Sequence, residues 1–553
     1  MKTTFFFPKK YFYSISLLII WGQILLSSCS TADHRNTDKS IFKYNEPAGI
    51  ATLDPAFARD LPHIWVCNQL YNRLVKLNDS LIVEPSLAKS WTVSQDGLVY
   101  HFVLRDDVFF HDDPVFNGKR RELTADDFVF SFNRLRKAET ASPGGWVFSN
   151  VESSNEAFRA LNDTVLEIRL KKAFPAFLGI LSMQYCSVIP FEAVEFYGPD
   201  FRKHPVGTGP FFLKNWEESI QMVLRKNEHY FETEKGRRLP YLDAVSISFL
   251  IDKMTAFLEF AKGDLDFLSG IDPAYKDELL NRQGQLREKY SDEFVMISNP
   301  YLNTEYFGIL VDTSLTEIKE SPLQLRTVRQ AINYGFDRKK MIRYLRNGIG
   351  TPGTKGIIPK GMPAFDKDAD FGYNFNPQKS KDLLASAGFD AAHPVPEITL
   401  VTTSDYLDLC KFVQAQLQEV GFAIEIQVSP PAAVREMKAL SKLHFFRASW
   451  IADYPDEENY LSLFYSENFA PNGPNYTHFS NAVFDSLYRA AFQEIDQNNR
   501  IKLYREMDSL VMIEAPVAIL YYDQVSRFVQ KNVKGMTSNP VNLLKLEKVW
   551  KED

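Results

Sequence analysis

A strand, a helix and a second strand follow one another within residues 398–428, and this pattern constrains the fold more than any other part of the sequence. Residues 398–402 form a short apolar run, residues 407–420 carry apolar side chains at helical spacing up to Gly421, and residues 423–428 form a second strand pattern. Two strands joined by a helix in this way lie parallel, with a right-handed crossover between them. The C-terminal half therefore contains an α/β domain.

Neighbouring segments support regular structure on both sides of this unit. Asn376 is a plausible N-cap with Pro377 at the first helical position, and Gly388 suits the position after the helix end. In the N-terminal half, short strands alternate with turn signals, as in residues 99–104 after the turn at residues 95–97. The sequence predicts a mixed α/β protein without internal repeats or low-complexity blocks.

The N-terminus has the pattern of a lipoprotein signal peptide. Three lysines lie within the first ten residues, an apolar run of roughly 16 residues follows at 11–26, and small residues precede Cys29. A run of this length is shorter than the ~20 residues of a transmembrane helix. The ending resembles a bacterial lipobox, in which Cys29 is acylated, although cleavage nearby with an incidental Cys29 gives the same pattern. We expect a signal peptide at 1–28, a polar tether at 29–40, and an extracytoplasmic chain held at the membrane by lipid.

Charge and composition exclude some classes of protein. Removal of the signal takes away three lysines and no acids, so the net charge changes from -7 to -10. Such a balance argues against a nucleic-acid partner, which needs a basic face. Aromatic residues make up 14% of the chain, which favours an aromatic-rich core over a carbohydrate platform. The chain is long enough to bury more than one core.

Cysteine content predicts at most one disulfide. If Cys29 carries lipid, Cys67, Cys186 and Cys410 remain, and the sequence does not decide whether any two of them pair.

No catalytic, cofactor or metal motif has the context that its chemistry requires. Residues 348–353 match GxGxxG, but a helical pattern precedes them and Pro352 lies inside them, so we expect a helix exit and loop rather than a dinucleotide site. The sequence contains no HExxH, GxSxG or CxxC motif. Adjacent acidic pairs lack the spacing and turn glycine of an EF-hand loop, and surface solvation and helix capping explain them. We expect no enzyme activity, no cofactor and no metal.

A series of landmarks, in order along the chain, resembles the dipeptide/oligopeptide class of ABC-transporter solute-binding proteins, extracellular solute-binding protein family 5. The resemblance covers about residues 41–550, and the order of the strings is more specific than any one of them. The landmarks are residues 53–56 (LDPA), 84–91 (EPSLAKSW), 96–105 (DGLVYHFVLR), 123–128 (LTADDF), 207–211 (GTGPF), 263–266 (GDLD), 326–332 (RTVRQAI) and 381–389 (KDLLASAGF).

This resemblance implies a two-lobed periplasmic-binding-protein fold, the type II three-domain variant, with a hinge and a ligand cleft between the lobes. Lobe I would comprise residues 41–300 plus 525–553, with 90–205 as its extra subdomain, and lobe II residues 300–525. Closure of the lobes around a solute is what the transporter would recognise. The resemblance further implies a monomer that works with ABC permease subunits.

The most specific functional segment is residues 447–456 (RASWIADYPD). Residues 444–450 alternate as a strand, which places Asp453 just past its carboxyl end, where open α/β sheets place ligands. By resemblance, Asp453 takes the place of an aspartate that pairs with the α-ammonium group of a peptide; its alternative role is to cap a helix near Pro455. Arg447 matches an arginine that meets the peptide carboxylate, or else forms a routine ion pair.

Three aromatic residues are further candidates. Trp450 would supply a flat wall for a side-chain pocket, with core packing as its alternative, and Trp146 and Phe148 would line the opposite wall. The chain departs from the family pattern at Asp113, where related proteins often have glycine, and no cysteine follows Trp450, so lobe II would be held by packing alone.

The expected function is capture of short peptides by the lipid-anchored component of an ABC uptake system. Two alternatives remain open on the sequence. The same fold binds other solutes, such as nickel chelates, haem or oligosaccharides. An envelope hydrolase or chaperone lipoprotein is a third class, for which no catalytic constellation is present.

Overall fold

The structure is a computed structural model that describes residue 1 and residues 40–154, 156–272 and 274–552. Apart from Met1 and Ser40, the predicted signal peptide at 1–28, the lipidation site Cys29 and the tether at 29–40 lie outside the described residues. No helix in the described part of the chain has both the length and the apolar character needed to cross a membrane. Residues 41–553 form one compact unit.

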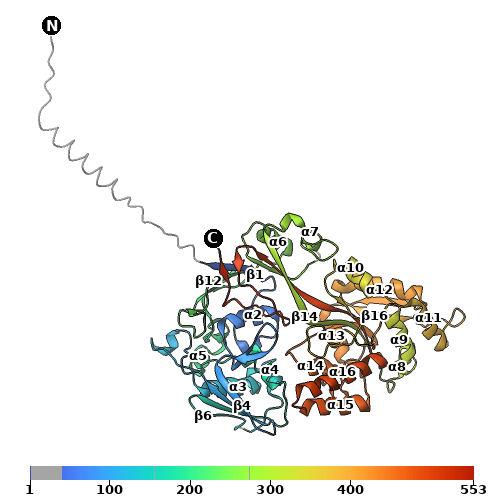
Figure 1. Cartoon of the computed structure of the whole chain (residues 1–553), viewed down its shortest axis with the longest axis horizontal. Coiled ribbons are helices and arrows are strands. Elements are labelled where there is room, and N and C mark those ends of the chain that lie inside the picture. The colour runs from blue at the N-terminus through green and yellow to red at the C-terminus, as the bar shows by residue number, and fades with distance from the viewer. Residues whose placement is uncertain (2–39, 155, 273, 553) are drawn as a thin grey trace. The chain divides into compact units, whose positions relative to one another are not determined.

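A single large sheet extends through this unit. Its centre is a pair of long antiparallel strands, β14 (Phe294–Ile309) and β19 (Val517–Gln530), which Figure 1 shows between the blue to green elements and the yellow to red elements. The predicted lobe boundaries at 300 and 525 fall inside these two strands, where Asn299 pairs with Val525. In spatial order the sheet runs β17 (Ile424–Val428), β16 (Ile398–Thr402), β18 (Phe445–Ile451), β14, β19, β13 (Phe267–Ser269), β1 (Ile41–Asn45), β12 (Ala244–Ser248), β9 (Gln221–Lys226) and β8 (Phe211–Glu217), and β15 (Thr351–Pro352) pairs with β19 off this path.

A smaller antiparallel sheet lies in the N-terminal half, and its first strand begins two residues before the range 90–205 expected for the extra subdomain. Its order is β4 (Ala88–Val93), β5 (Val99–Leu104), β7 (Val165–Arg169) and β6 (Phe158–Asn162), and α3 (Ala125–Arg136) contacts β6. A capping box formed by Thr124 and Asp127 starts α3, as the acidic pair before Phe128 predicts. Asp127 is buried and accepts a hydrogen bond from Arg121 at 2.7 Å.

The strand, helix and strand predicted at 398–428 are confirmed. Strands β16 and β17 pair in parallel, and α12 (Leu407–Glu419) connects them. The preceding helix α11 (Pro377–Ser386) is capped by Asn376, whose side chain accepts from the Lys379 amide at 3.0 Å. The GxGxxG string follows α10 (Arg338–Leu345) and forms only the two-residue β15, so it lacks the strand-to-helix turn of a dinucleotide site.

The remaining elements complete both halves of the chain. Helices are α2 (Leu61–Leu70), α4 (Phe177–Ile180), α5 (Phe191–Tyr197), α6 (Lys253–Ala261), α7 (Lys276–Leu279), α8 (Thr316–Lys319), α9 (Arg326–Tyr334), α13 (Pro431–Ala439), α14 (Glu458–Leu461), α15 (Ala482–Gln493) and α16 (Gln497–Glu514). Two-stranded pairs are β2 (Val75–Leu77) with β3 (Val83–Pro85), β10 (Thr233–Glu234) with β11 (Arg237–Arg238), and β20 (Val533–Lys534) with β21 (Trp550–Lys551).

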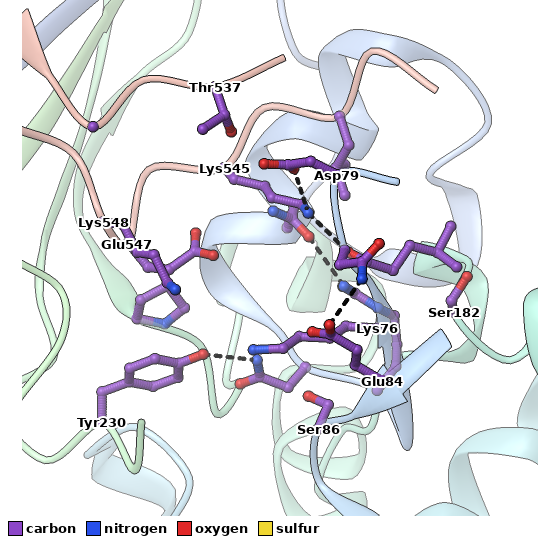
Figure 2. A pocket seen from close by; sticks show the side chains of 18 residues that line it. Lys76, Asp79, Glu84, Ser86, Ser182, Tyr230, Thr537, Lys545, Glu547 and Lys548 are labelled. Atoms are coloured by element: carbon purple, nitrogen blue, oxygen red, sulfur yellow. Dashed lines mark hydrogen bonds and ion pairs between the residues drawn. The ribbon is translucent and has the colours of Figure 1, made fainter. Parts of the chain in front are cut away.

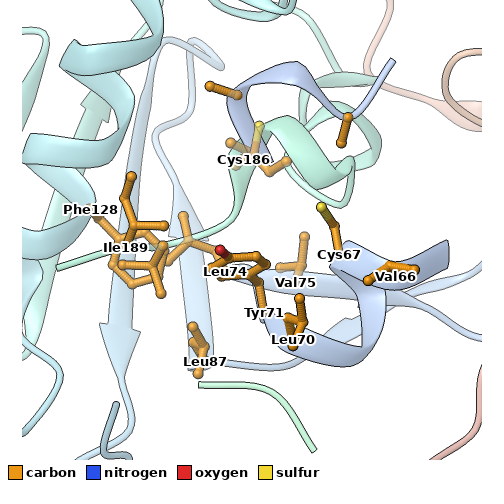
Figure 3. Close-up of a cluster of buried hydrophobic side chains, with 14 of the residues drawn as sticks. Val66, Cys67, Leu70, Tyr71, Leu74, Val75, Leu87, Phe128, Cys186 and Ile189 are labelled. Atoms are coloured by element: carbon orange, nitrogen blue, oxygen red, sulfur yellow. The ribbon is translucent and has the colours of Figure 1, made fainter. Parts of the chain in front are cut away.

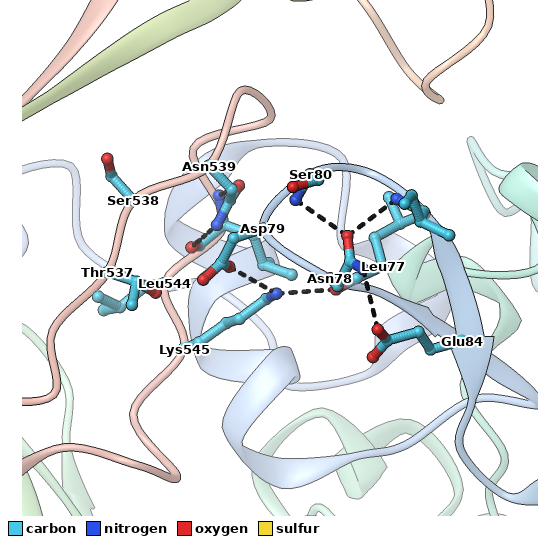
Figure 4. A network of polar contacts seen from close by, with 12 residues as sticks. Leu77, Asn78, Asp79, Ser80, Glu84, Thr537, Ser538, Asn539, Leu544 and Lys545 are labelled. Carbon is cyan, nitrogen blue, oxygen red and sulfur yellow. Dashed lines mark hydrogen bonds and ion pairs between the residues drawn. The ribbon is translucent and has the colours of Figure 1, made fainter.

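The C-terminal segment after β19 packs against the start of the chain. Lys545 Nζ binds Asp79 Oδ1 at 2.9 Å and the Leu77 carbonyl at 2.8 Å, as Figure 4 shows. The Trp65 indole on α2 donates to the Asn542 carbonyl at 2.7 Å. These bonds join segments more than 460 positions apart, so the C-terminus belongs to the same body as residues 41–85.

The cysteines of the described residues are free thiols in the cores. Cys67 and Cys186 lie in the large N-terminal hydrophobic cluster (Figure 3), and Cys410 lies in the cluster around α9 and α12. Burial raises the pKa of all three thiols, to about 11 for Cys410. These thiols are therefore apolar packing groups, and none of them forms a disulfide with another.

Candidate functional site

A cavity of about 360 Å³ lies between the N-terminal and C-terminal halves, and we call it the cleft. One wall comes from the turn before α2, from Trp146 and from residues 182–185. The facing wall comes from Tyr301 on β14 and from residues 451–455 after β18. The cleft thus opens at the carboxyl end of β18, where an α/β sheet places its ligand.

Asp453 lines the cleft two residues beyond the end of β18. Its carboxylate is open to the cavity, although protein crowds it closely enough that desolvation raises its pKa. Asn459 holds it in place: the Asp453 amide donates to Asn459 Oδ1 at 3.1 Å, and Asn459 Nδ2 donates to Asp453 Oδ2 at 3.4 Å. Within the described residues nothing donates to Oδ1, so this oxygen is available to a ligand.

Asp453 does not cap the helix that follows. Helix α14 begins later, at Glu458, and there Asp456 Oδ1 accepts from the Glu458 amide at 3.0 Å. The capping alternative for Asp453 is therefore wrong, because Asp456 and not Asp453 accepts from the first amide of α14.

Arg447, predicted to meet the peptide carboxylate, is not among the residues that line the cleft. Its guanidinium donates to the buried carboxylate of Glu305 on β14 and lies over the Tyr406 ring, with its central carbon 3.2 Å from the ring centroid. Burial alone would lower the pKa of Arg447. The nearby charge of Glu305 opposes this effect, and the pKa of Arg447 is raised overall. The ion-pair alternative is the one that the structure supports, because Glu305 occupies this guanidinium inside the fold.

Trp450 also lies outside the cleft wall. It packs against the C-terminal core, and its indole Nε1 donates to Asn459 Oδ1 at 2.8 Å. Asn459 therefore accepts from Trp450 and from the Asp453 amide at the same time. The residue predicted as a pocket wall instead positions the amide that holds Asp453.

The two aromatic candidates of the N-terminal half, Trp146 and Phe148, lie in different environments. Trp146 lines the cleft with 40% of its surface exposed, and its ring centroid lies 6.2 Å from that of Tyr454. Phe148 is buried, with ring centroids at 4.8 Å from Phe132 and 5.0 Å from Phe158. Its predicted place on the wall is wrong, because the short 3-10 turn at Gly145–Phe148 directs it into the core.

Sequence reasoning missed most of the polar residues of the cleft. Tyr185, Gln184, Tyr301 and Arg59 line it, and Asn459 supports it from behind. Burial, followed by the nearby Asp453, raises the pKa of Tyr185 to about 12, while Arg59 opposes the shift. Of these residues, only Arg59 had a signal in the sequence. It is a charged residue that comes shortly after the landmark at 53–56 and a short apolar stretch.

Aromatic side chains join the two halves beside the cleft. The Phe174 ring stacks on Phe492 with centroids 4.4 Å apart and meets Tyr454 edge-on at 6.4 Å. Tyr454 and Tyr488 both donate to the carboxylate of Glu458, which is buried. Burial raises the pKa of Glu458 to about 7. Glu458, whose pKa lies near neutral pH, therefore holds Tyr454, which contacts Phe174 of the other half.

Glu458 is expected to make the fold less stable as pH rises. Its pKa is about 7 in the folded chain and 4.5 in the reference state, so the folded form binds the extra proton between these values. The stabilisation is complete below about pH 4.5 and is lost as pH rises through about 7, with an upper limit of about 3 kcal/mol. Glu458→Gln should therefore reduce the fall in melting temperature between pH 5 and pH 8. Glu467→Gln, at an exposed carboxylate, is the control; an equal fall in all three proteins would contradict the assignment.

A second, polar cavity of about 180 Å³ lies near the C-terminal segment and shares Leu77, Ser182 and Leu543 with the cleft (Figure 2). Three of its four bases, Lys76, Lys545 and Lys548, form ion pairs within the fold, whereas Arg73 donates, among the described residues, only to the Asn68 side chain. Glu84 and Glu547 line the same space, so it offers no clear excess of either charge. No group of three or more potential metal-ligating side chains occurs within the described residues.

Comparison with known proteins agrees with this architecture. The family model of bacterial extracellular solute-binding proteins, family 5 Middle, matches residues 83–472. The glutathione-binding protein GsiB of Salmonella typhi is 26% identical over 499 residues, covering 89% of this chain and 91% of the relative. The dipeptide-binding protein of Escherichia coli is 25% identical over 501 residues, covering 87% and 88%.

Solved structures show the same fold. HbpA2 from Haemophilus parasuis matches with a TM-score of 0.79 at 23% identity, covering 93% of this chain and all of that one. DppA from Helicobacter pylori in complex with peptide STSA matches with a TM-score of 0.75 at 24% identity, covering 94% and 100%. The architecture is therefore the two-lobed fold of periplasmic binding proteins. The chain belongs to family 5 of the bacterial extracellular solute-binding proteins, the dipeptide and oligopeptide type associated with ABC transporters, and is a binding protein rather than an enzyme.

Proposed function

We propose that this protein captures short peptides in the cleft and delivers them to the permease subunits of an ABC uptake system, and that lipid on Cys29 holds it at the membrane. The observation that carries the peptide proposal is the carboxylate of Asp453, which faces the cleft with one oxygen free of partners in the described residues. Labelling with radioactive palmitate, lost in Cys29→Ala, tests the anchor.

A fixed carboxylate suits peptides because every peptide with a free amino end carries the same α-ammonium group. A charge-assisted hydrogen bond to that group contributes about 1.5–3 kcal/mol without contact to any side chain. Asn459 and Trp450 hold the carboxylate before the ligand arrives, which reduces the entropy lost on binding. The cleft can thus anchor one end of the ligand while remaining tolerant of its sequence.

Two sequence relatives and one solved structure support a peptide ligand. Their names give a dipeptide and glutathione as ligands, and the related DppA structure holds a four-residue peptide. Closure would follow from the position of the site, because a ligand that touches both walls stabilises the closed form in proportion to its preference for that form.

Thermal unfolding of the full chain with and without a pool of tri- to pentapeptides tests the proposal. At about 100 times its dissociation constant, a ligand adds about 2.7 kcal/mol of stability, which should raise the melting temperature by a few degrees. The same pool with acetylated amino ends should give no rise, because acetylation removes the charge that Asp453 recognises. No rise with either pool, after bound ligand has been removed by unfolding and refolding, would contradict peptide capture and favour a non-peptide solute.

A further inference from the structure

Arg59 lies in the cleft wall formed by the turn before α2. Its side chain is exposed and makes no hydrogen bond or ion pair with any described residue. The neighbouring Asp60 is already engaged, because it caps α2 by accepting from the His63 amide at 3.3 Å and also contacts the His63 ring. Arg59 is thus a cation held at the cleft without a counter-ion of its own.

Two other arginines of the C-terminal half, the predicted carboxylate partner Arg447 and also Arg346, are paired with acids inside the fold. Arg447 is paired with Glu305, and Arg346 binds Asp523 at 2.5 Å. Among the described residues that line the cleft, Arg59 is the one basic side chain. A negative group on a ligand in this cavity therefore has one cationic partner available.

Tyr185 lines the same cavity as Asp453 and Arg59. Its phenol lies within electrostatic reach of both Asp453 and Arg59, and all three line the same cavity. Gly144 fixes the ring, because a Cβ at that position would lie 2.3 Å from Tyr185 Cδ1. The acid, the base and the phenol of Tyr185 therefore line one cavity, in which a single ligand can contact all three.

We propose that Arg59 binds the α-carboxylate of the ligand, so that the cleft holds both ends of a short zwitterionic peptide, with the ammonium group at Asp453. This inference rests on the proposed function. The cavity of about 360 Å³ is at the small end of ligand sites, which favours peptides of a few residues over longer ones. A longer peptide would have to give up one contact or bend.

Calorimetric titration of the full chain with trialanine, its C-terminal amide and its N-acetyl form tests the assignment. We expect amidation to weaken binding by about 10-fold or more, the effect of losing one charge-assisted hydrogen bond. Arg59→Gln should weaken binding of trialanine to the same degree and leave binding of the amide unchanged. Arg59→Lys should recover part of the affinity. Arg343→Gln, at an exposed arginine on α10 outside the cleft wall, is the matched control.

The outcomes separate this inference from the proposed function. If N-acetylation abolishes binding while amidation and Arg59→Gln leave it unchanged, the Arg59 assignment is overturned and peptide capture stands. If trialanine does not bind in any form, peptide capture fails and the Arg59 assignment fails with it. Equal melting temperatures of Arg59→Gln and the control would show that a loss of affinity is local, as expected for an exposed side chain.

Discussion

Replacing Asp453 by asparagine should weaken peptide binding by about 10-fold to 100-fold, equivalent to the ~1.5–3 kcal/mol of one charge-assisted hydrogen bond. Asparagine has nearly the same shape and still accepts from Asn459 Nδ2, so the change removes charge and little else. The ligand ammonium group would then enter the cleft without a counter-ion. Calorimetric titration with trialanine measures the loss.

Asp60→Asn is the matched control for this change. Asp60 lines the same cavity and carries the same charge, but its carboxylate caps α2, a role that asparagine also performs well. The control therefore reports the general electrostatic contribution of an acid in the cleft. Equal affinities in Asp453→Asn and Asp60→Asn would show that Asp453 makes no direct contact with the ligand.

Replacing Arg447 by methionine should destabilise the C-terminal half by about 3–5 kcal/mol, because Glu305 would remain buried without its partner. Burial already raises the pKa of Glu305, and Arg447 is the main influence that opposes the rise. Without Arg447 the carboxyl group would take up a proton, so the destabilisation should be larger at pH 8 than at pH 5. Urea unfolding followed at both pH values measures the effect.

Two further variants make this result specific. Arg489→Met removes an exposed pair with Glu467, separated by 3.8 Å, and should change stability by less than about 1 kcal/mol. Arg447→Met combined with Glu305→Gln removes both charges and should recover much of the lost stability. If the double variant is as unstable as Arg447→Met, lost packing on Tyr406 rather than an isolated charge would explain the effect.

Local sequence patterns predicted individual helices and strands. They also predicted that Asp453 follows the end of a strand. The capping residues of α11 and the strand pattern before Asp453 depend only on nearby sequence, and both match the structure. The role of Arg447 depends on Glu305, 142 positions earlier, and on the pairing of β14 with β18 that brings them together. No local pattern carries that register, so an unpaired arginine on a strand cannot be distinguished from a paired one in the sequence.

The aromatic residues show the same limit at shorter range. Trp146 and Phe148 differ by two positions, and only the tight 3-10 turn that contains both directs one into the cleft and the other into the core. Trp450 shows that a residue can belong to the site without touching the cavity. Its contact with Asn459 requires the chain to fold back nine positions later, which periodicity does not predict.

Strands β14 and β19 pair as the two arms of one hairpin, and residues 310–516 form the connection between them. Gly308 pairs with Val517, and the Ile309 amide donates to the Pro516 carbonyl at 2.9 Å, so the segment between them leaves and returns at neighbouring points. The entropy of closing such a loop rises only with the logarithm of its length, by about 0.6 kcal/mol per doubling. Insertions or deletions within residues 310–516 therefore have little thermodynamic effect on the closure of that hairpin. Insertions or deletions in residues 310–516 can therefore remodel the cleft wall that contains Asp453, while β14 and β19 keep their pairing register.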